Sequence, residues 1–205
     1  MATSNTTNSI GMSEAGQATQ EARWFVLVQP VQASSEWQEL LTELEPLTGG
    51  KGDGVPHVTV VHGRGTAAIE DVAAAVESLR GELVPVRAEG EPVFWHGPQM
   101  HFQWTMAQPV AKDEDLQPWY ERICSGMHGL GLVKEWSWES WKPYVTVLRG
   151  GEGRPFPDTA ARQRALQVLH ARVSAVDFTI EQVWASRLHA GQFHRVASLR
   201  VGKRV

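Results

Sequence analysis

From residue 23 onward the chain alternates two kinds of apolar pattern. Short runs rich in β-branched and aromatic residues are typical of strands, and apolar residues three or four positions apart are typical of helices that bury one face. The irregular order of these segments favours an α+β fold over a regular doubly wound sheet. Strands are predicted at 24–28, 55–61, 83–88, 93–95, 100–106, 144–148, 178–186 and 193–201, and helices at 35–48, 69–79, 116–127 and 158–173.

Two of the predicted helices begin with capping residues. Ser35 is followed three positions later by Gln38, which is the spacing of a capping box. Asp158 is predicted as the N-cap of the last helix, because its carboxylate can accept from the backbone N–H groups of the first turn.

Residues 1 to 21 show neither pattern. They contain almost no large apolar side chain, so burial cannot offset the entropy lost when such a segment becomes ordered. We therefore predict a flexible tail at 1–21 and a single domain at 22–205. A chain of 205 residues is long enough to build one core of ordinary size.

Composition excludes several classes of protein. Lys and Arg number 19 against 23 Asp and Glu, a net charge of −4, which disfavours a general binder of duplex DNA. No apolar run approaches the ~18 residues of a membrane span. Cys124, the single cysteine, cannot form an intramolecular disulfide and is predicted to lie in the core. No signal-peptide pattern begins the chain, so a cytoplasmic location is expected.

Trp is the unusual component, with nine residues against two Tyr and six Phe. Trp fills cores and interfaces, but its ring also stacks on nucleobases. Trp136, Trp138 and Trp141 recur at short spacing just before the strand at 144–148. For Trp141 both interpretations, packing and base stacking, stay open.

One short segment occurs twice. PHVTVVHG at 56–63 returns as PYVTVLRG at 143–150, with five of eight positions identical. Because strand side chains alternate between faces, His57 and Thr59 share one face of the first copy, and Tyr144 and Thr146 share the same face of the second.

Each copy taken alone could be an ordinary half-buried strand with a His that bonds a backbone carbonyl. The duplication, including both Pro and both Gly residues, instead favours two strands that face one ligand. We therefore predict that His57 and Tyr144 converge on one cleft. Strict alternation would place His62 and its counterpart Arg149 away from that cleft.

The two copies resemble the paired H-x-T/S-x motifs of the 2H phosphoesterase superfamily, which includes 2′–5′ RNA ligase-like proteins and cyclic nucleotide phosphodiesterases. The resemblance covers residues 23 to 201. It implies a two-lobed, pseudo-symmetric α+β fold, with antiparallel sheets around a central cleft and helices outside. It also implies a site that needs no metal or organic cofactor and a small nucleotide or RNA end as partner.

The resemblance assigns His57 to proton transfer and Thr59 and Thr146 to the phosphate. Tyr144 stands where the family has its second His. A phenol with an ordinary pKa of about 10 is protonated at neutral pH, so Tyr144 could serve as an acid or hydrogen-bond donor and His57 would be the base. This departure concerns catalysis rather than the fold.

One further His is a candidate ionisable group. His101 lies on the polar face of the strand at 100–106, where a solvated face and an auxiliary ionisable group are alternatives. His170, His189 and His194 have no Asp, Glu or Cys at metal-binding spacing, so no metal site is predicted.

Two functional hypotheses follow. The first is a metal-independent phosphodiesterase acting on a 2′,3′-cyclic phosphate or a 2′–5′ phosphodiester of a nucleotide or RNA end, with His57 as base and Tyr144 as acid. The second is a non-catalytic protein of the same fold that binds a nucleotide or RNA end. They differ in the role of Tyr144.

Overall fold

The computed structural model describes residues 22–99, 102–132, 137–151, 153–189 and 192–201. The predicted tail at 1–21 and the candidate His101 lie outside these residues. No helix in the described ranges is long and apolar enough to cross a membrane.

An eight-stranded antiparallel sheet runs through the molecule in the order β10-β9-β1-β3-β7-β6-β5, with β2 paired to β7. A separate two-stranded sheet joins β4 to β8. The strands are β1 (Ala22–Gln29), β2 (Lys51–Gly52), β3 (Val58–Gly65), β4 (Val84–Val86), β5 (Val93–Gln99), β6 (Phe102–Pro109), β7 (Tyr144–Gly150), β8 (Phe178–Ile180), β9 (Gln182–His189) and β10 (Gln192–Arg200). The helices are α1 (Ser35–Thr48), α2 (Ile69–Ser78), α3 (Gln117–Gly129) and α4 (Thr159–Ala171), and a 3₁₀ turn spans Val173–Val176.

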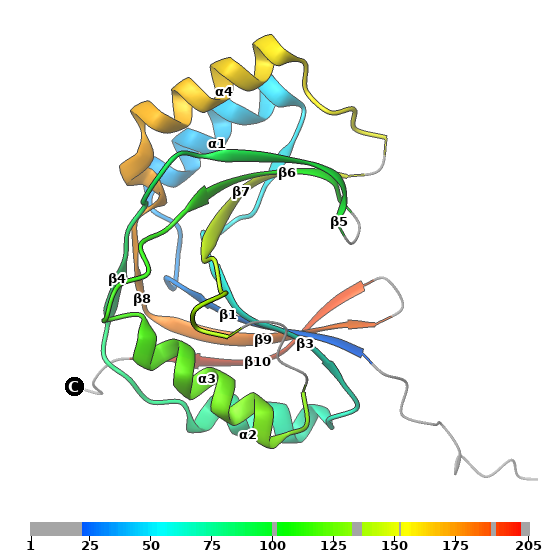
Figure 1. Ribbon diagram of the computed structural model, residues 1–205, viewed down its shortest axis with the longest axis vertical. Coiled ribbons are helices and arrows are strands. Elements are labelled where there is room, and N and C mark those ends of the chain that lie inside the picture. Colours follow the sequence, from blue (N-terminus) through cyan, green and yellow to red (C-terminus); the bar gives the residue numbers. More distant parts are fainter. Residues whose placement is uncertain (1–21, 100–101, 133–136, 152, 190–191, 202–205) are drawn as a thin grey trace, which may run out of the picture.

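The large sheet is sharply bent and carries its helices on the outside (Figure 1). Helices α1 and α4 cover β5, β6 and β7, while α2 and α3 cover β1, β3, β9 and β10. Each half is thus a sheet layer backed by two helices on its outer side. The predicted α+β class, with antiparallel sheets and external helices, is confirmed.

The two halves of the sheet join at β3 and β7, the strands that carry the repeat. These strands are antiparallel and pair at one position, Val58 opposite Val145. Both valines are fully buried. The two strands that carry the repeat therefore lie side by side.

Helix ends follow the predictions in part. Asp158 caps α4 and accepts from the N–H of Ala161, as expected. The predicted capping box at Ser35 is wrong by one residue: Ser34 is the N-cap of α1 and accepts from the N–H of Trp37. Gln38 instead donates its side-chain amide to the carbonyl of Gly54, which ties α1 to the loop before β3.

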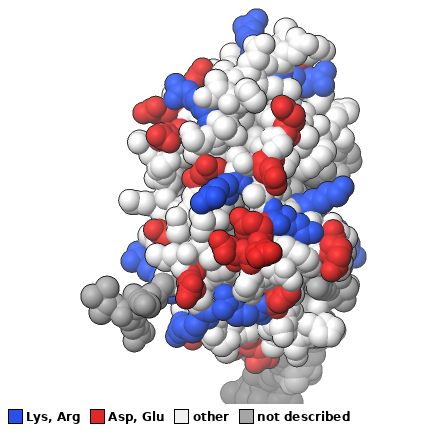
Figure 2. All heavy atoms as spheres, turned by 60° about the vertical axis from the view of Figure 1, so that its left-hand side comes forward, with Lys and Arg blue, Asp and Glu red and all other residues white. Residues whose placement is uncertain are grey.

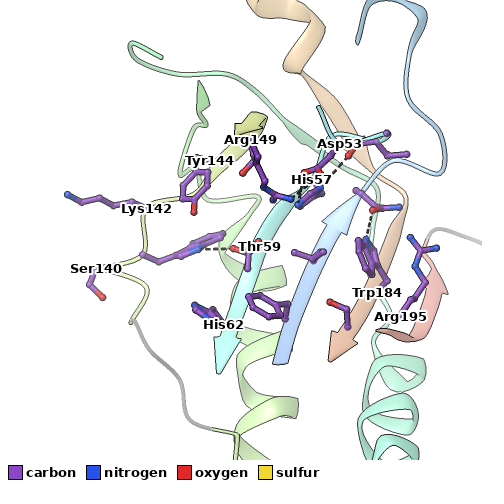
Figure 3. Close-up of a pocket in the computed structure, with 18 residues that line it drawn as sticks. Asp53, His57, Thr59, His62, Ser140, Lys142, Tyr144, Arg149, Trp184 and Arg195 are labelled. Atoms are coloured by element: carbon purple, nitrogen blue, oxygen red, sulfur yellow. Dashed lines mark hydrogen bonds and ion pairs between the residues drawn. The ribbon is translucent and has the colours of Figure 1, made fainter. Parts of the chain in front are cut away.

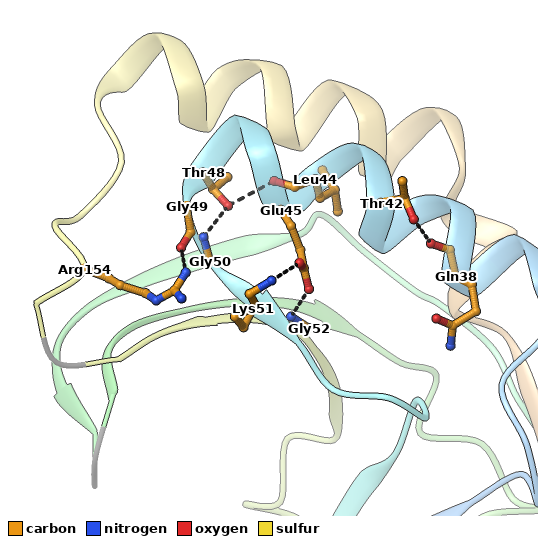
Figure 4. A network of polar contacts seen from close by, with 10 residues as sticks. All are labelled: Gln38, Thr42, Leu44, Glu45, Thr48, Gly49, Gly50, Lys51, Gly52 and Arg154. Atoms are coloured by element: carbon orange, nitrogen blue, oxygen red, sulfur yellow. Dashed lines mark hydrogen bonds and ion pairs between the residues drawn. The ribbon is translucent and has the colours of Figure 1, made fainter.

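A polar network fixes the opposite end of α1 to β2 (Figure 4). Gly49 has a left-handed φ of 69° and closes the helix. Glu45 accepts from the Lys51 ammonium at 2.6 Å and from the Gly52 N–H at 3.0 Å. Arg154 donates to the Gly49 carbonyl. The chain therefore leaves α1 along a defined path into β2, which pairs with β7.

Buried Trp residues join segments that are distant in sequence. Trp37, Trp104 and Trp119 are fully buried, and each donates its indole N–H to a backbone carbonyl, of Asp53, Pro155 and Glu82 respectively. An unpaired buried N–H would cost about 1–3 kcal/mol, so these bonds fix the position of each indole.

Gly150, which ends the second repeat, packs against the ring of Trp104, and a substitution there tests how much the fold depends on this contact. A Cβ at Gly150 would lie 1.9 Å from Nε1 of Trp104, whereas a Cβ at Gly151 would meet no atom within 4 Å. We expect Gly150→Ala to lower the free energy of unfolding by about 1–3 kcal/mol through overpacking. Gly151→Ala is the matched control and should leave it nearly unchanged. Thermal denaturation of the two variants checks this, and equal melting temperatures would contradict it.

Candidate active site

A cavity of about 890 Å³ lies on the concave side where the two halves of the sheet meet. The predicted residues His57, Thr59, Tyr144 and Thr146 all line it. Figure 3 shows the two repeat strands contributing side chains to this shared space. Strands β1, β9 and β10 and the loops before β3 and β7 complete the wall.

His62 and Arg149 also line the cavity, which corrects the prediction that they point away. The reason is a change of register in each repeat strand. Val61 pairs with Val26, but Thr59 pairs with the next residue of β1, Leu27, so β3 has one extra residue. In β7, Leu148 pairs with Met106 and Thr146 pairs with Ala107, which is the same irregularity at the equivalent place.

A β-bulge shifts the alternation of side chains by one position. In the first copy the two residues after the Thr, Val60 and Val61, are therefore both buried, and the next residue again faces the cavity. The second copy behaves identically, with Val147 and Leu148 both buried. Two adjacent apolar residues in each copy were the sequence signal for the bulges, and strict alternation overlooked it.

His57 is 9% exposed and its ring has a defined orientation. Its Nδ1 lies 3.3 Å from the carbonyl oxygen of Val55, which can only accept, so Nδ1 carries the proton of the neutral ring. Nε2 then holds the lone pair. Burial lowers the pKa of His57 below its ordinary value; the Asp53 charge acts in the opposite direction, and Arg149 lowers this pKa further. The imidazole is therefore neutral at neutral pH, as a general base requires.

Asp53 forms a charged cluster with residues of both copies. Its carboxylate accepts from Nη1 of Arg149 at 3.0 Å, and its other oxygen lies 3.8 Å from Nε2 of His57. Trp37 holds the Asp53 backbone through its carbonyl. Motif reasoning missed Asp53, because its position depends on the pairing of β2 with β7 just before it.

Tyr144 is half-buried, and the ring of Trp95 packs edge-on against it with centroids 4.7 Å apart. Burial raises the pKa of Tyr144 above 10, and the Arg149 charge partly opposes this. The phenol therefore keeps its proton across the neutral and mildly alkaline range. It can donate a hydrogen bond or a proton to a ligand.

Trp141 also lines the cavity but is only 3% exposed. Its ring stacks on Tyr120 with centroids 4.7 Å apart, and its N–H donates to the carbonyl of Thr59. Trp138 packs against the same pair of rings. These contacts favour packing over base stacking for Trp141.

The cavity lining differs in charge from the outer face of the molecule shown in Figure 2. On the face shown in Figure 2, basic and acidic side chains are interspersed. Among the residues lining the cavity, Lys142, Arg149 and Arg195 are basic and Asp53 alone is acidic. This excess of positive charge suits an anionic ligand. No cluster of three or more His, Cys, Asp or Glu side chains that could hold a metal ion occurs in the described ranges.

Comparisons with known proteins bear on the fold. No protein-family model and no curated protein sequence matches the chain. Several solved structures match in shape. Usb1 of Kluyveromyces marxianus has a TM-score of 0.50 and 10% identity, covering 85% of this chain and 97% of its own. E. coli LigT, complexed with 3′-AMP, has a TM-score of 0.51 and 11% identity, covering 90% and 100%. A further structure, described as a phosphoesterase, matches with the same values as LigT.

These similarities establish a class at the level of fold. The chain has the two-lobed α+β fold of the Usb1 and LigT structures, which is the fold that its resemblance to the 2H phosphoesterases implies. With identities of 10% and 11%, the likeness extends to the fold alone.

The charged cluster around His57 predicts that two substitutions shift the His57 pKa in opposite directions. Asp53→Asn removes the charge that raises the His57 pKa, so this pKa should fall further. Arg149→Met removes a charge that lowers it, so the pKa should rise. An NMR titration of the His57 ring, assigned by comparison with His57→Gln, measures both. Shifts of the same sign in the two variants would contradict the arrangement.

Proposed function

We propose that the protein is a metal-independent 2H-type phosphodiesterase that cleaves a 2′,3′-cyclic phosphate or a 2′–5′ phosphodiester of a nucleotide or RNA end. The observation that carries the proposal is the convergence of both repeat copies on one basic cavity. Nucleotides also occupy two of the structures with this fold, 3′-AMP in LigT and uridine monophosphate in Usb1.

His57 acts as the general base in this proposal. Nε2 takes a proton from the attacking water or hydroxyl as the new P–O bond forms. The resulting imidazolium lies beside the Asp53 carboxylate, which offsets its charge. The hydrogen bond from Nδ1 to Val55 holds the ring in the required tautomer throughout.

Tyr144 acts as the general acid from the opposite copy of the repeat. As the bond from phosphorus to the leaving oxygen breaks, the phenol gives that oxygen its proton. The leaving group then departs as an alcohol, and Tyr144 remains in the site as a phenolate. Arg149 stabilises this phenolate, in keeping with its lowering effect on the Tyr144 pKa.

Thr59 and Thr146 donate to the nonbridging phosphate oxygens. They occupy equivalent positions of the two copies and line the same cavity. As charge builds on these oxygens in the transition state, hydrogen bonds to them strengthen.

The alternative is a binding protein of the same fold without turnover. One observation favours this alternative. Burial raises the pKa of Tyr144, and a phenol with a higher pKa is a weaker acid. It shares the cavity and the phosphate contacts of the first hypothesis. Only the chemistry at Tyr144 separates the two.

Substitution at Tyr144 decides between them. If Tyr144 is the acid, Tyr144→Phe should lower kcat by roughly 10²–10⁴-fold with little change in KM. The native rate should rise with pH through the lowered pKa of His57 and then stay level until the raised pKa of Tyr144, above 10. These rates are measured on 2′,3′-cyclic mononucleotides and 2′–5′ oligonucleotides.

A binding protein would give a different result in the same assay. The native chain would show no turnover at any pH, while a direct binding measurement would still detect the same compounds. Tyr144→His would then be expected to restore some activity, because both Thr residues and His57 are present. A Tyr144→Phe variant as fast as the native protein would contradict the acid role.

The phosphate contacts are tested by isosteric substitution. Thr59→Val and Thr146→Val should each weaken the binding of adenosine 3′-monophosphate by about 1–3 kcal/mol, because each removes a donor to a charged acceptor. Thr42→Val, on the outer helix α1, is the control and should bind normally. Calorimetry measures the affinities, and unchanged affinity in both cavity variants would remove these residues from the site.

A further inference from the structure

One row of side chains crosses the floor of the cavity from the phosphate contact to an aromatic ring. Strand pairing places Thr59 opposite Leu27, and Leu27 opposite Trp184. All three residues line the cavity. Strands lie ~4.8 Å apart, so Trp184 is about 10 Å from Thr59 across β1. A phosphate at Thr59, a ribose over Leu27 and a base at Trp184 would follow this row in the order in which they are bonded.

The Trp184 indole is held in a fixed plane. Its N–H donates to the side-chain oxygen of Gln29, a residue only 4% exposed. The amide nitrogen of Gln29 in turn donates to Gln182 at 3.3 Å. A ring fixed before the ligand arrives loses little conformational entropy on binding.

Arg195 covers the side of Trp184 that is remote from Thr59 (Figure 3). Its guanidinium carbon lies 4.3 Å from the centre of the indole ring. A register shift in β10 between Arg195 and Ala197 places Arg195 opposite Ser186, next to Trp184 on the same face. Strand β10 lies on the side of β9 away from β1, so Arg195 and Leu27 lie on opposite sides of Trp184 in the sheet.

Trp184 differs from the Trp residues near the second repeat. Trp141 is buried under its own packing contacts, and Trp138 is not among the residues that line the cavity. Trp184 is partly exposed and lines the cavity. Its ring lies edge-on to the ring of His57, the proposed general base, with centroids 6.3 Å apart. It therefore combines an accessible ring with closeness to the reacting groups.

We propose that Trp184 is a stacking platform for the nucleobase of the sugar that carries the scissile phosphate, with Leu27 beneath the ribose and Arg195 behind the indole. This inference rests on the proposed function and narrows it. The substrate is a nucleoside phosphate whose base contributes to affinity, rather than a simple phosphodiester. Stacking on an aromatic ring tolerates different bases. The platform therefore requires that the ligand has a nucleobase, but it selects little among the bases.

The test compares two ligands that differ only in the base. Adenosine 3′-monophosphate and 1-O-methylribose 3-phosphate are titrated calorimetrically into the native protein, Trp184→Leu, Trp184→Phe and Trp138→Leu. Trp138→Leu is the matched control, because it removes another half-buried indole outside the cavity. Trp184→Leu should weaken the nucleotide roughly 5- to 150-fold and leave the base-free ligand unchanged. Trp184→Phe should restore most of the affinity, and Trp138→Leu should resemble the native protein.

Fluorescence gives a second measurement should Trp184→Leu fail to fold. Stacking of adenine on Trp184 should quench emission of the native protein more than that of Trp184→Phe. Equal quenching, or equal loss of both ligands in Trp184→Leu, would overturn the platform while leaving the phosphate site intact. If neither phosphate compound binds the native protein, the proposed function fails and the platform fails with it.

Discussion

The single backbone pair between Val58 and Val145 is the constraint on which the site depends. It brings the two copies of the repeat together with opposite chain direction, so each copy presents the same residues to a common space. The segment that precedes each copy also makes a hydrogen-bonded contact with the other copy. Strand β2, which precedes His57, pairs with β7, and Trp141, which precedes Tyr144, donates to the Thr59 carbonyl. Displacing either strand would therefore disturb both halves of the site.

Much of the fold was predictable because it depends on local pattern. The apolar spacing of α1 and the carboxylate cap of α4 are properties of short segments, and both helices form close to where the sequence indicates. The repeat identified the two strands at the centre of the site for the same reason. Their side chains could be assigned to a face only as far as Thr59 and Thr146, where regular alternation ends.

The rest of the site depends on pairing partners that no local pattern specifies. A bulge is defined against the opposite strand, so the orientation of His62 and Arg149 needed the registers with β1 and β6. Asp53 reaches Arg149 through a two-residue strand too short to predict. The sequence could not single out Trp184 from its nine Trp residues, because composition does not distinguish a ring that fills the core from one that lines a cavity.

The charge balance of the cavity offers a physical reason for a Tyr at position 144. A second His would have to be an imidazolium to act as an acid, and it would carry that charge in a half-buried position whose electrostatics already include the Arg149 guanidinium. A protonated phenol is neutral and avoids this repulsion. In the proposed reaction the charges then develop with favourable neighbours: His57 becomes positive beside Asp53, and Tyr144 becomes negative in the field of Arg149. The ion pair of Asp53 and Arg149 would thus serve both ends of the proposed proton transfer, and a Tyr at position 144 is compatible with that reaction.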